Sequence, residues 1–175
     1  ADSGSTDGLP TGPVTALEPT LVLTAIAGAT THLGLIGTAS TSYNEPYNLA
    51  RRFASLDLIS GGRAGWNIVT TADVSSARAF GQANVLNHAE RYRRAAEFTD
   101  VVRGLWNSWE DDAIIGDPAT GRFVDLDKLH AVRHEGEFFS VQGVLNQPRS
   151  PQGHPVLVQA GGCAEGWALP ARHAG

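Results

Sequence analysis

The sequence contains no methionine and only one cysteine, Cys163. A single cysteine excludes a disulfide within the chain and any zinc site built from several thiolates. It also fits a reducing compartment, so we expect the protein to be cytoplasmic. Because Ala1 stands where an initiator methionine would stand, we expect the chain to be processed or to be a segment of a longer reading frame.

The chain also lacks an excess of positive charge and a long hydrophobic run. It has 13 Lys and Arg against 18 Asp and Glu, a net charge of −5 at pH 7. This balance gives no electrostatic reason to bind nucleic acid or an anionic membrane. The longest apolar stretch, near residues 21–29, is too short to span a bilayer. The phosphate-binding patterns G-x-G-x-x-G and G-x-x-x-x-G-K-[ST] do not occur.

The most informative pattern that is present is a strand, a helix and a second strand. A near-continuous apolar run at 33–39 predicts a strand covered on both faces, residues 46–59 predict a helix, and residues 64–71 predict the second strand. The two strands of such a unit should be parallel. Ligands bind at the carboxyl ends of parallel strands. Here those ends are rich in Thr, Ser and Asn, which can hydrogen-bond a ligand without adding charge.

Further segments extend this alternation. Residues 18–31 begin with Glu18-Pro19, a typical helix start, and are apolar on most sides, so we expect a well-buried helix. Residues 88–109 predict the longest helix. Its buried stripe consists of Phe98, Val102, Leu105 and Trp109. Residues 155–160 predict a third buried strand, and a last helical segment is expected to open at residue 161.

Residues 110–154 interrupt the alternation with acidic and Gly/Pro-rich segments and a short β-like run at 137–144. They hold too few apolar residues for a core of their own, so we interpret them as an irregular excursion. The acidic run 110–112 is typical of a solvated surface. His130 and His134 indicate loop residues, because no Glu accompanies them in an HExxH pattern. We therefore predict no metal site.

The alternation favours an α/β fold, for which two architectures compete: a β/α barrel and an open doubly wound sheet. The missing phosphate loop disfavours the open sheet. A complete barrel needs about 250 residues, so this chain is expected to form only part of one. A partial barrel leaves strand edges and core uncovered. We therefore expect the isolated chain to be poorly stable and to dimerise or aggregate, as a homo-oligomer.

Three blocks, in order along the chain, carry a resemblance to a known family. They are EPTLVLTAIAGATTHLGLIGTASTSYNEPYNLARRFASLDLISGGRAGWNIVT, NHAERYRRAAEFTDVVRGLWNSWEDDA and PQGHPVLVQAG. They closely resemble the luciferase-like flavin monooxygenases, in the branch of nitrilotriacetate, EDTA and dibenzothiophene-sulfone monooxygenases. The resemblance implies a partial (β/α)8 TIM barrel. Residues 1–175 would be a single incomplete domain, the middle segment of that barrel, with an irregular excursion around 110–154.

The resemblance also implies an activity. Members of the family use FMN, supplied as FMNH2 by a separate NAD(P)H:FMN reductase, and molecular oxygen. They oxygenate a small organic substrate at a carbon next to nitrogen or sulfur, after which the C–N or C–S bond breaks. The protein holds the flavin, excludes water and positions the substrate, while the cofactor carries the oxygen chemistry.

Four residues of the first two blocks are candidates for the flavin site. Thr38 matches a family position close to the flavin ring. Asn67 lies in a predicted strand, where a buried amide needs a partner, which flavin, substrate or backbone would provide. His88 and Tyr92 lie one helical turn apart and share a face. The resemblance implies that both line the flavin site, with Tyr92 near the phosphate.

Three candidates lie near the ends of the chain. Gly162 and Cys163 follow the third strand, where family members usually carry two serines that bind the flavin phosphate. Backbone N–H groups at that turn still offer an anion site, so we expect weaker phosphate binding. Asp2 matches an acidic family residue that approaches the flavin. No catalytic residue is assigned.

Two other functions remain open. The first is a deazaflavin (F420)-dependent oxidoreductase of the same superfamily, which would transfer hydride with deazaflavin and not with FMN. The second is a non-catalytic flavin-binding remnant, suggested by the missing serines at 162 and 163 and by Pro170 within a predicted helix.

Overall fold

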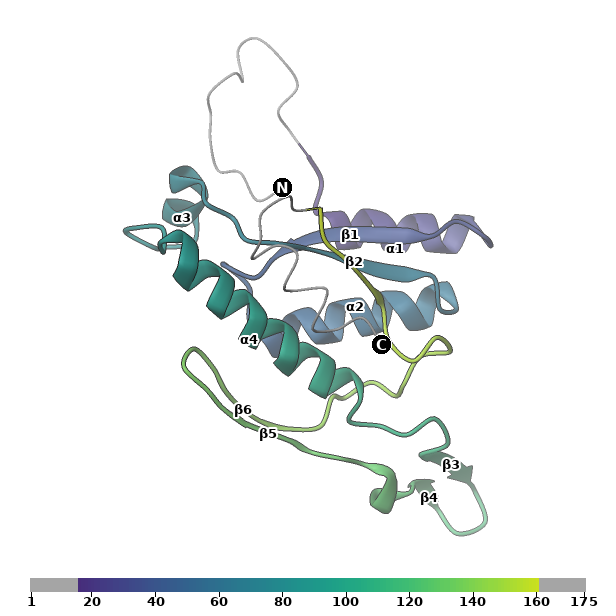
Figure 1. Cartoon of the computed structure of the whole chain (residues 1–175). Helices are drawn as coiled ribbons and strands as arrows, with labels where there is room; N and C mark the ends of the chain where they lie inside the picture. The colour runs from purple at the N-terminus through teal and green to yellow at the C-terminus, as the bar shows by residue number, and fades with distance from the viewer. Residues whose placement is uncertain (1–15, 161–175) are drawn as a thin grey trace.

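The computed structural model describes residues 16–160 (Figure 1). Asp2, Gly162 and Cys163, and the helix expected from residue 161, lie outside the described residues. The first half of the described chain contains α1 (Pro19–Ala29), β1 (Leu35–Ser40), α2 (Pro46–Ser60), β2 (Ala64–Val69), α3 (Val74–Ala79) and α4 (His88–Trp106). The second half contains β3 (Ile114–Asp117), β4 (Arg122–Val124), a 3-10 turn (Leu126–Lys128), β5 (Val132–Glu135), β6 (Ser140–Gly143) and β7 (Val156–Val158).

The centre of the fold is a three-stranded sheet in the order β1-β2-β7, with both pairs parallel. The predicted parallel pairing of the first two strands is therefore confirmed. Helix α2 connects β1 to β2, and α3, α4 and the excursion connect β2 to β7, as Figure 1 shows. This succession of parallel strands and helices is the repeating unit of a β/α barrel.

The two faces of this sheet differ. Leu35, Ala39 and Trp66 are buried against the helices. On the opposite face Ile36 is 55% exposed and Val156 is 53% exposed. The expectation that the first strand is covered on both faces is wrong for the described residues, because the helices lie on one face and no described element covers the other.

Helix α1 also differs from expectation. It starts as predicted, with Pro19 at its first position and the Glu18 carboxylate accepting a hydrogen bond from the Leu21 N–H at 2.9 Å. However, only Thr20 and Ala27 are buried, and Leu21 is 72% exposed. The helix is apolar around most of its surface, but α2 and β1 cover only one side of it. The expectation of a well-buried helix is therefore wrong.

The main core lies between the sheet, α2 and α4. The Trp66 indole is fully buried with ring centroids 6.1 Å from Phe53, 5.9 Å from Phe98 and 6.2 Å from Trp106. Phe98, Val102 and Leu105 are buried as the helical spacing predicts. These α4 side chains share one apolar cluster with Trp66 of β2, and the burial of that cluster holds α4 against the sheet.

The last residue of the predicted stripe, Trp109, is not in the helix. Helix α4 ends at Trp106, with Asn107 as its carboxyl-terminal cap. The Trp109 indole N–H instead donates to the Leu145 carbonyl at 2.6 Å. Trp106 is the last buried residue of the helix. The helix therefore ends about one turn earlier than predicted.

Two side chains fasten the amino-terminal ends of the strands. The Arg63 guanidinium donates to the carbonyls of Ala27, Thr30 and Leu33 at 3.1, 2.8 and 2.7 Å. The buried Asp57 carboxylate accepts the Ala64 N–H at 2.9 Å, and it also accepts from Ser150 and Gln152. Helix α2 stops just before Arg63, since Gly61 caps it with a left-handed φ of 68°.

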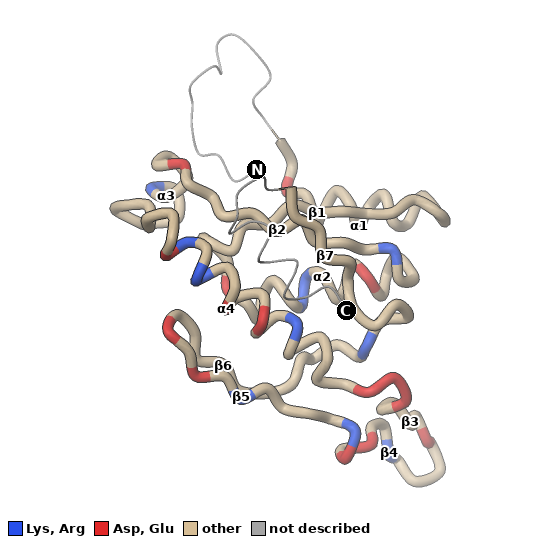
Figure 2. The backbone as a smooth tube through the Cα atoms, viewed as in Figure 1, with Lys and Arg blue, Asp and Glu red and all other residues tan. Residues whose placement is uncertain are grey.

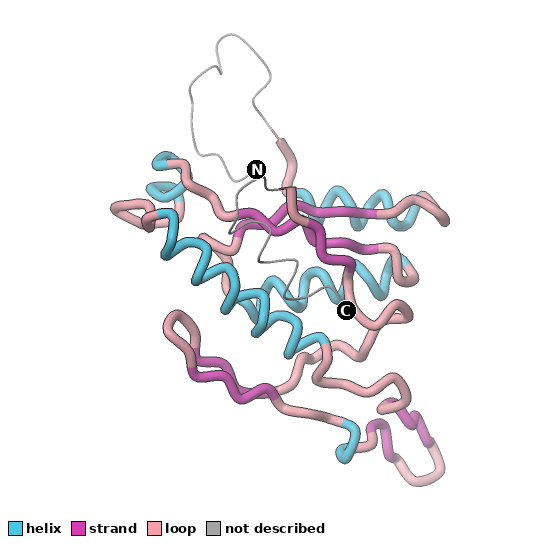
Figure 3. Tube along the Cα trace, in the orientation of Figure 1, coloured by secondary structure: helices cyan, strands magenta, loops and turns pink. Residues whose placement is uncertain are grey.

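The excursion at 110–154 consists of two antiparallel hairpins, β3–β4 and β5–β6, joined by turns (Figure 3). The β-like run at 137–144 contains β6, and Phe139 and Leu145 contribute to the main core. His130 lies outside the named elements as predicted, whereas His134 lies in β5, which corrects its assignment to a loop. The apolar alternation that would reveal a strand is missing there, because His134 takes one of the two half-buried positions of β5.

The acidic run 110–112 lies before β3, among other charged positions (Figure 2). Each carboxylate has a cationic or histidine partner: Glu110 with His130, Asp111 with Arg149 and Asp112 with Lys128. Within residues 16–160 there is no group of three His, Cys, Asp or Glu arranged to hold a metal ion.

Candidate functional site

Two of the predicted residues meet on the sheet face opposite the helices, which we call the bare face because no described element covers it. Thr38 in β1 is paired with Asn67 in β2 by the parallel register. The Asn67 amide nitrogen donates to the Thr38 hydroxyl at 3.0 Å. The Asn67 side-chain oxygen is buried and has no hydrogen-bond partner among the described residues. An unpaired buried amide oxygen is an acceptor that a ligand N–H or O–H would satisfy.

The other two predicted residues meet at the start of α4. The rings of His88 and Tyr92 have centroids 4.7 Å apart and are tilted by 40°. This confirms that the two side chains share a helical face. The helix start is fixed by a capping box in which the Asn87 side chain accepts the Glu90 N–H at 3.0 Å. Two side chains with N–H and O–H donors are thereby presented together.

The hydroxyl-rich strand ends were expected to offer hydrogen bonds to a ligand. In the structure many of these groups bond to each other across β1 and β2. The Thr71 hydroxyl donates to the Ser40 hydroxyl at 2.8 Å, and the Ser42 hydroxyl donates to the Thr71 carbonyl at 3.3 Å. Thr41 is buried and donates to the Val69 carbonyl at 3.2 Å. These hydroxyls hold the strand ends together.

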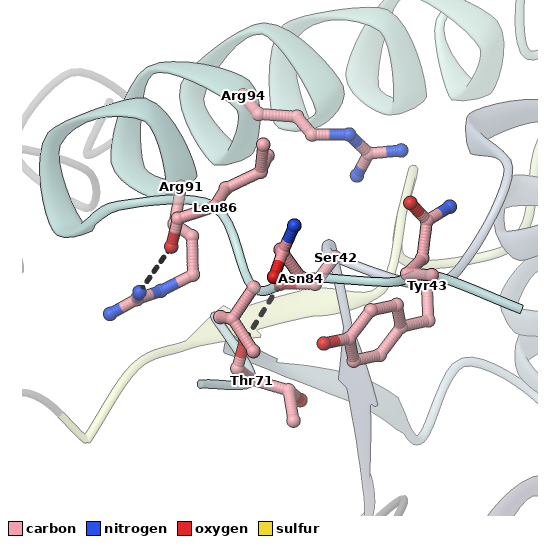
Figure 4. Close-up of a pocket in the computed structure, with 9 residues that line it drawn as sticks. Ser42, Tyr43, Thr71, Asn84, Leu86, Arg91 and Arg94 are labelled. Atoms are coloured by element: carbon pink, nitrogen blue, oxygen red, sulfur yellow. Dashed lines mark hydrogen bonds between the residues drawn. The ribbon is translucent and has the colours of Figure 1, made fainter. Parts of the chain in front are cut away.

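Beyond these strand ends lies a pocket of about 90 Å³ that the sequence reasoning missed. Figure 4 shows residues from the loops after β1 and β2, from the loop before α4 and from α4 itself around it. Its lining consists of Ser42, Tyr43, Thr71, Gln82, Asn84, Val85, Leu86, Arg91 and Arg94. The signal was present in RYRRAAEF, because residues three apart on a helix share a face and two of these arginines stand at that spacing.

Tyr43 forms one wall of this pocket. Its ring stacks on Phe80 at the end of α3, with centroids 5.0 Å apart and planes within 7° of parallel. Burial and the negative charge of Asp73 raise the pKa of the Tyr43 hydroxyl, although Arg91 acts in the opposite direction. The hydroxyl therefore stays protonated at neutral pH and can donate a hydrogen bond.

The sequence as a whole matches the luciferase-like monooxygenase family over residues 3–175. The chain belongs to the luciferase-like monooxygenase family. It is 52% identical over 158 residues to nitrilotriacetate monooxygenase component A of Aminobacter aminovorans, covering 90% of this chain and 35% of that protein. It is 51% identical over 161 residues to the N-acetyl-S-(2-succino)cysteine monooxygenase of Bacillus subtilis (strain 168), covering 92% and 36%.

A solved structure agrees with the fold. The crystal structure of riboflavin lyase with modified FMN and riboflavin matches 87% of this chain and 34% of that chain, with a TM-score of 0.82 and 44% identity. The chain therefore spans about a third of the length of the relatives it matches. The expected family and a partial luciferase-like barrel are confirmed. No helix among the described residues is long and apolar enough to cross a membrane.

Proposed function

We propose that the protein is a two-component monooxygenase that uses FMNH2 and molecular oxygen. We also propose that residues 1–175 form the middle segment of one β/α barrel and contribute part of the flavin site. The observation that carries the proposal is the Thr38–Asn67 pair, with its unsatisfied buried amide oxygen, on a sheet face that no described element covers.

The residues present suit a flavin mononucleotide. The Asn67 oxygen is an acceptor for a ring N–H, and Thr38 offers a hydroxyl beside it. His88 and Tyr92 offer donors of the kind that a phosphate accepts. Thr38 and Asn67 lie in β1 and β2. His88 and Tyr92 lie at the amino-terminal end of α4, which comes after β2 in the chain. In β/α folds, ligands are bound at the carboxyl ends of the strands.

The flavin, once reduced and bound, supplies the oxygen chemistry. The tasks of this chain are then to orient the ring through Thr38 and Asn67 and to hold the phosphate through His88 and Tyr92. We propose that the 162–163 turn adds backbone N–H donors for the phosphate, and that Asp2 approaches the ring. The sheet face that carries Thr38 and Asn67 needs further cover to exclude water from the reaction.

The substrate is proposed to be a small organic molecule that loses a C–N or C–S bond after oxygenation of the adjacent carbon. The names of two relatives support this, because nitrilotriacetate contains C–N bonds and N-acetyl-S-(2-succino)cysteine contains C–S bonds. One of them is named as component A of its enzyme. That name supports a second component here, an NAD(P)H:FMN reductase that delivers FMNH2.

The proposal is tested by titrating the full-length protein with FMN and following flavin fluorescence. Thr38→Val removes the hydroxyl with little change in volume, and His88→Ala removes one phosphate donor. Each is expected to weaken FMN binding by about tenfold. Oxygenation of a C–N or C–S substrate should require FMN, oxygen and a reductase. Turnover with deazaflavin alone, or without oxygen, would contradict the proposal.

A further inference from the structure

The pocket between α4 and the loops after β1 and β2 is positively charged. Two of its nine lining residues are arginines, and none is acidic. Its remaining lining is mostly neutral and polar. Asp73, Glu45 and Glu97 act on Tyr43 and Arg94 without lining the pocket. Because the lining itself holds two guanidinium groups and no carboxylate, an anion is the ligand that its electrostatics favour.

Arg94 is held in place without an anionic partner. Its guanidinium lies 4.6 Å from the ring centre of Phe139 and 5.9 Å from that of Phe98. Among residues 16–160 its buried Nη1 atom has no hydrogen-bond partner, and no carboxylate forms an ion pair with it. Burial lowers the pKa of Arg94, against the longer-range effect of Glu45 and Glu97. Even so, a guanidinium stays protonated in proteins.

Figure 4 shows Arg94 reaching from α4 across the space that Ser42, Asn84 and Tyr43 border on the other side. Arg91 lies one helical turn earlier and is anchored by a 2.7 Å hydrogen bond from its Nη1 to the Leu86 carbonyl. Its Nε is buried and has no partner among the described residues. In Figure 4 the Arg91 guanidinium turns toward the Leu86 carbonyl and away from Arg94. Arg94 is therefore the cation that reaches across the pocket, and Arg91 adds positive charge to a lining that also includes Tyr43.

The volume and the position of the pocket restrict the kind of anion that it can bind. About 90 Å³ accommodates a group of a few heavy atoms and not a whole flavin. None of the residues assigned to the flavin in the proposed function lines this pocket. A carboxylate has the planar, two-oxygen geometry that a guanidinium binds with paired hydrogen bonds. The ligand group is therefore expected to belong to the organic substrate.

We propose that Arg94, supported by Arg91 and Tyr43, binds a carboxylate of the substrate, so that the enzyme acts on carboxylate-bearing compounds. The inference that this ligand is a substrate rests on the proposed function. The binding of the carboxylate itself is independent of flavin chemistry. It can therefore be measured without turnover.

The test uses calorimetric titration of the full-length, flavin-free protein with succinate and with its neutral analogue succinamide. Succinate is expected to bind and succinamide not. Arg94→Gln should weaken succinate binding by about tenfold or more, whereas Arg94→Lys, which keeps the charge, should lose less. The matched control is Arg93→Gln, because the neighbouring Arg93 is exposed and pairs with Glu137 at 3.0 Å outside the pocket. It should bind succinate like the unaltered protein.

FMN titrations of the same variants separate this proposal from the previous one. Arg94→Gln is expected to leave FMN affinity unchanged within about twofold. Loss of FMN affinity with unchanged succinate affinity would assign the pocket to the cofactor phosphate and overturn the proposal. Equal binding of succinate to Arg94→Gln and to the unaltered protein, or no binding of succinate to either, would also overturn it. Succinate binding in a protein that does not bind FMN would support this site and contradict only the flavin assignment.

Discussion

The two faces of the β1-β2-β7 sheet are built from alternate residues of the same strands, yet they differ in chemistry. One face buries Leu35, Ala39 and Trp66 under helices. The other face carries Thr38 and Asn67 and leaves Ile36 half exposed. Side chains point to opposite faces at successive positions of a strand. Strands β1 and β2 thus each contribute to both the core and the candidate site.

This difference indicates that one face of the sheet contributes mainly to stability and the other mainly to ligand binding. The helix-covered face is apolar and closely packed, so substitutions there should change the free energy of unfolding. The bare face holds an unsatisfied amide oxygen, so substitutions there should change ligand affinity more than stability. The same division holds between the two ends of the strands, with Asp57 and Arg63 at the amino-terminal end and the pocket at the other.

The largest effect is expected for Trp66→Ala on the covered face. It removes a fully buried indole that contacts three aromatic rings and donates to the Ala39 carbonyl at 3.0 Å. The free energy of unfolding should fall by about 3–5 kcal/mol, measured by urea denaturation. Ile59→Ala is the control, because Ile59 in α2 is exposed and should cost within about 0.5 kcal/mol. Similar losses in both variants would break the comparison between buried and exposed positions.

The next largest effect is expected for Asp57→Ala at the amino-terminal end of the sheet. The substitution leaves the Ala64 N–H, the Ser150 hydroxyl and the Gln152 amide without their shared acceptor. Because these groups are buried or partly buried, the loss should be about 3 kcal/mol in urea denaturation.

The control for that experiment is Asp117→Ala. Asp117 also accepts hydrogen bonds, from Ala119 and Thr120, but it is the last residue of β3 and both of these bonds are exposed. Its loss should cost less than about 1 kcal/mol. Equal costs at the two positions would show that burial does not decide the contribution of these carboxylates.

A third prediction concerns the acid dependence of the β5–β6 hairpin. The Glu97 carboxylate accepts from the N–H groups of Phe138 and Phe139, and its Oε1 lies 2.9 Å from His134 Nε2. Burial raises the pKa of Glu97, but the hydrogen bonds from His134, Phe139 and Phe138 outweigh it and hold the pKa below its ordinary value of 4.5. A lowered pKa stabilises the fold above the unfolded-state pKa, and this stabilisation is lost as the pH falls through the folded-state value.

Glu97→Gln should therefore reduce the free energy of unfolding by about 1–3 kcal/mol at neutral pH. The difference from the unaltered protein should shrink as the pH falls below 4.5. Urea denaturation at several pH values measures both quantities. Glu137→Gln in the same hairpin is the control, because Glu137 is exposed and should contribute less than about 1 kcal/mol. A difference that stays constant with pH would contradict this account.

The smallest effect on stability is expected on the bare face. Asn67→Ala removes the hydrogen bond to Thr38 and also the unpaired oxygen, so stability should change by less than about 1 kcal/mol. FMN affinity, followed by fluorescence, should fall by about tenfold if the proposed function is right. Asn48→Ala, at an exposed position of α2, should change neither quantity. A large loss of stability with unchanged FMN affinity would reverse the roles of the two faces.

Much of the fold follows from local spacing. The starts of α1, α2 and α4 agree with expectation within about two residues, because caps and proline act through their immediate neighbours. The shared face of His88 and Tyr92 follows from helical geometry alone. The prediction failed where exposure depends on what lies outside an element, as for Leu21, and where the helix ended one turn early, before Trp109.

The sequence by itself therefore determined the alternation of parallel strands and helices, the family, and the local His88–Tyr92 pair. Only the tertiary structure decided that Asn67 bonds to Thr38, that Asp57 reaches Ser150, and that two arginines of α4 face the ends of β1 and β2. The physical reason is distance along the chain. A periodic pattern fixes which side chains share a face, whereas the register of strands and the path of loops fix which faces meet.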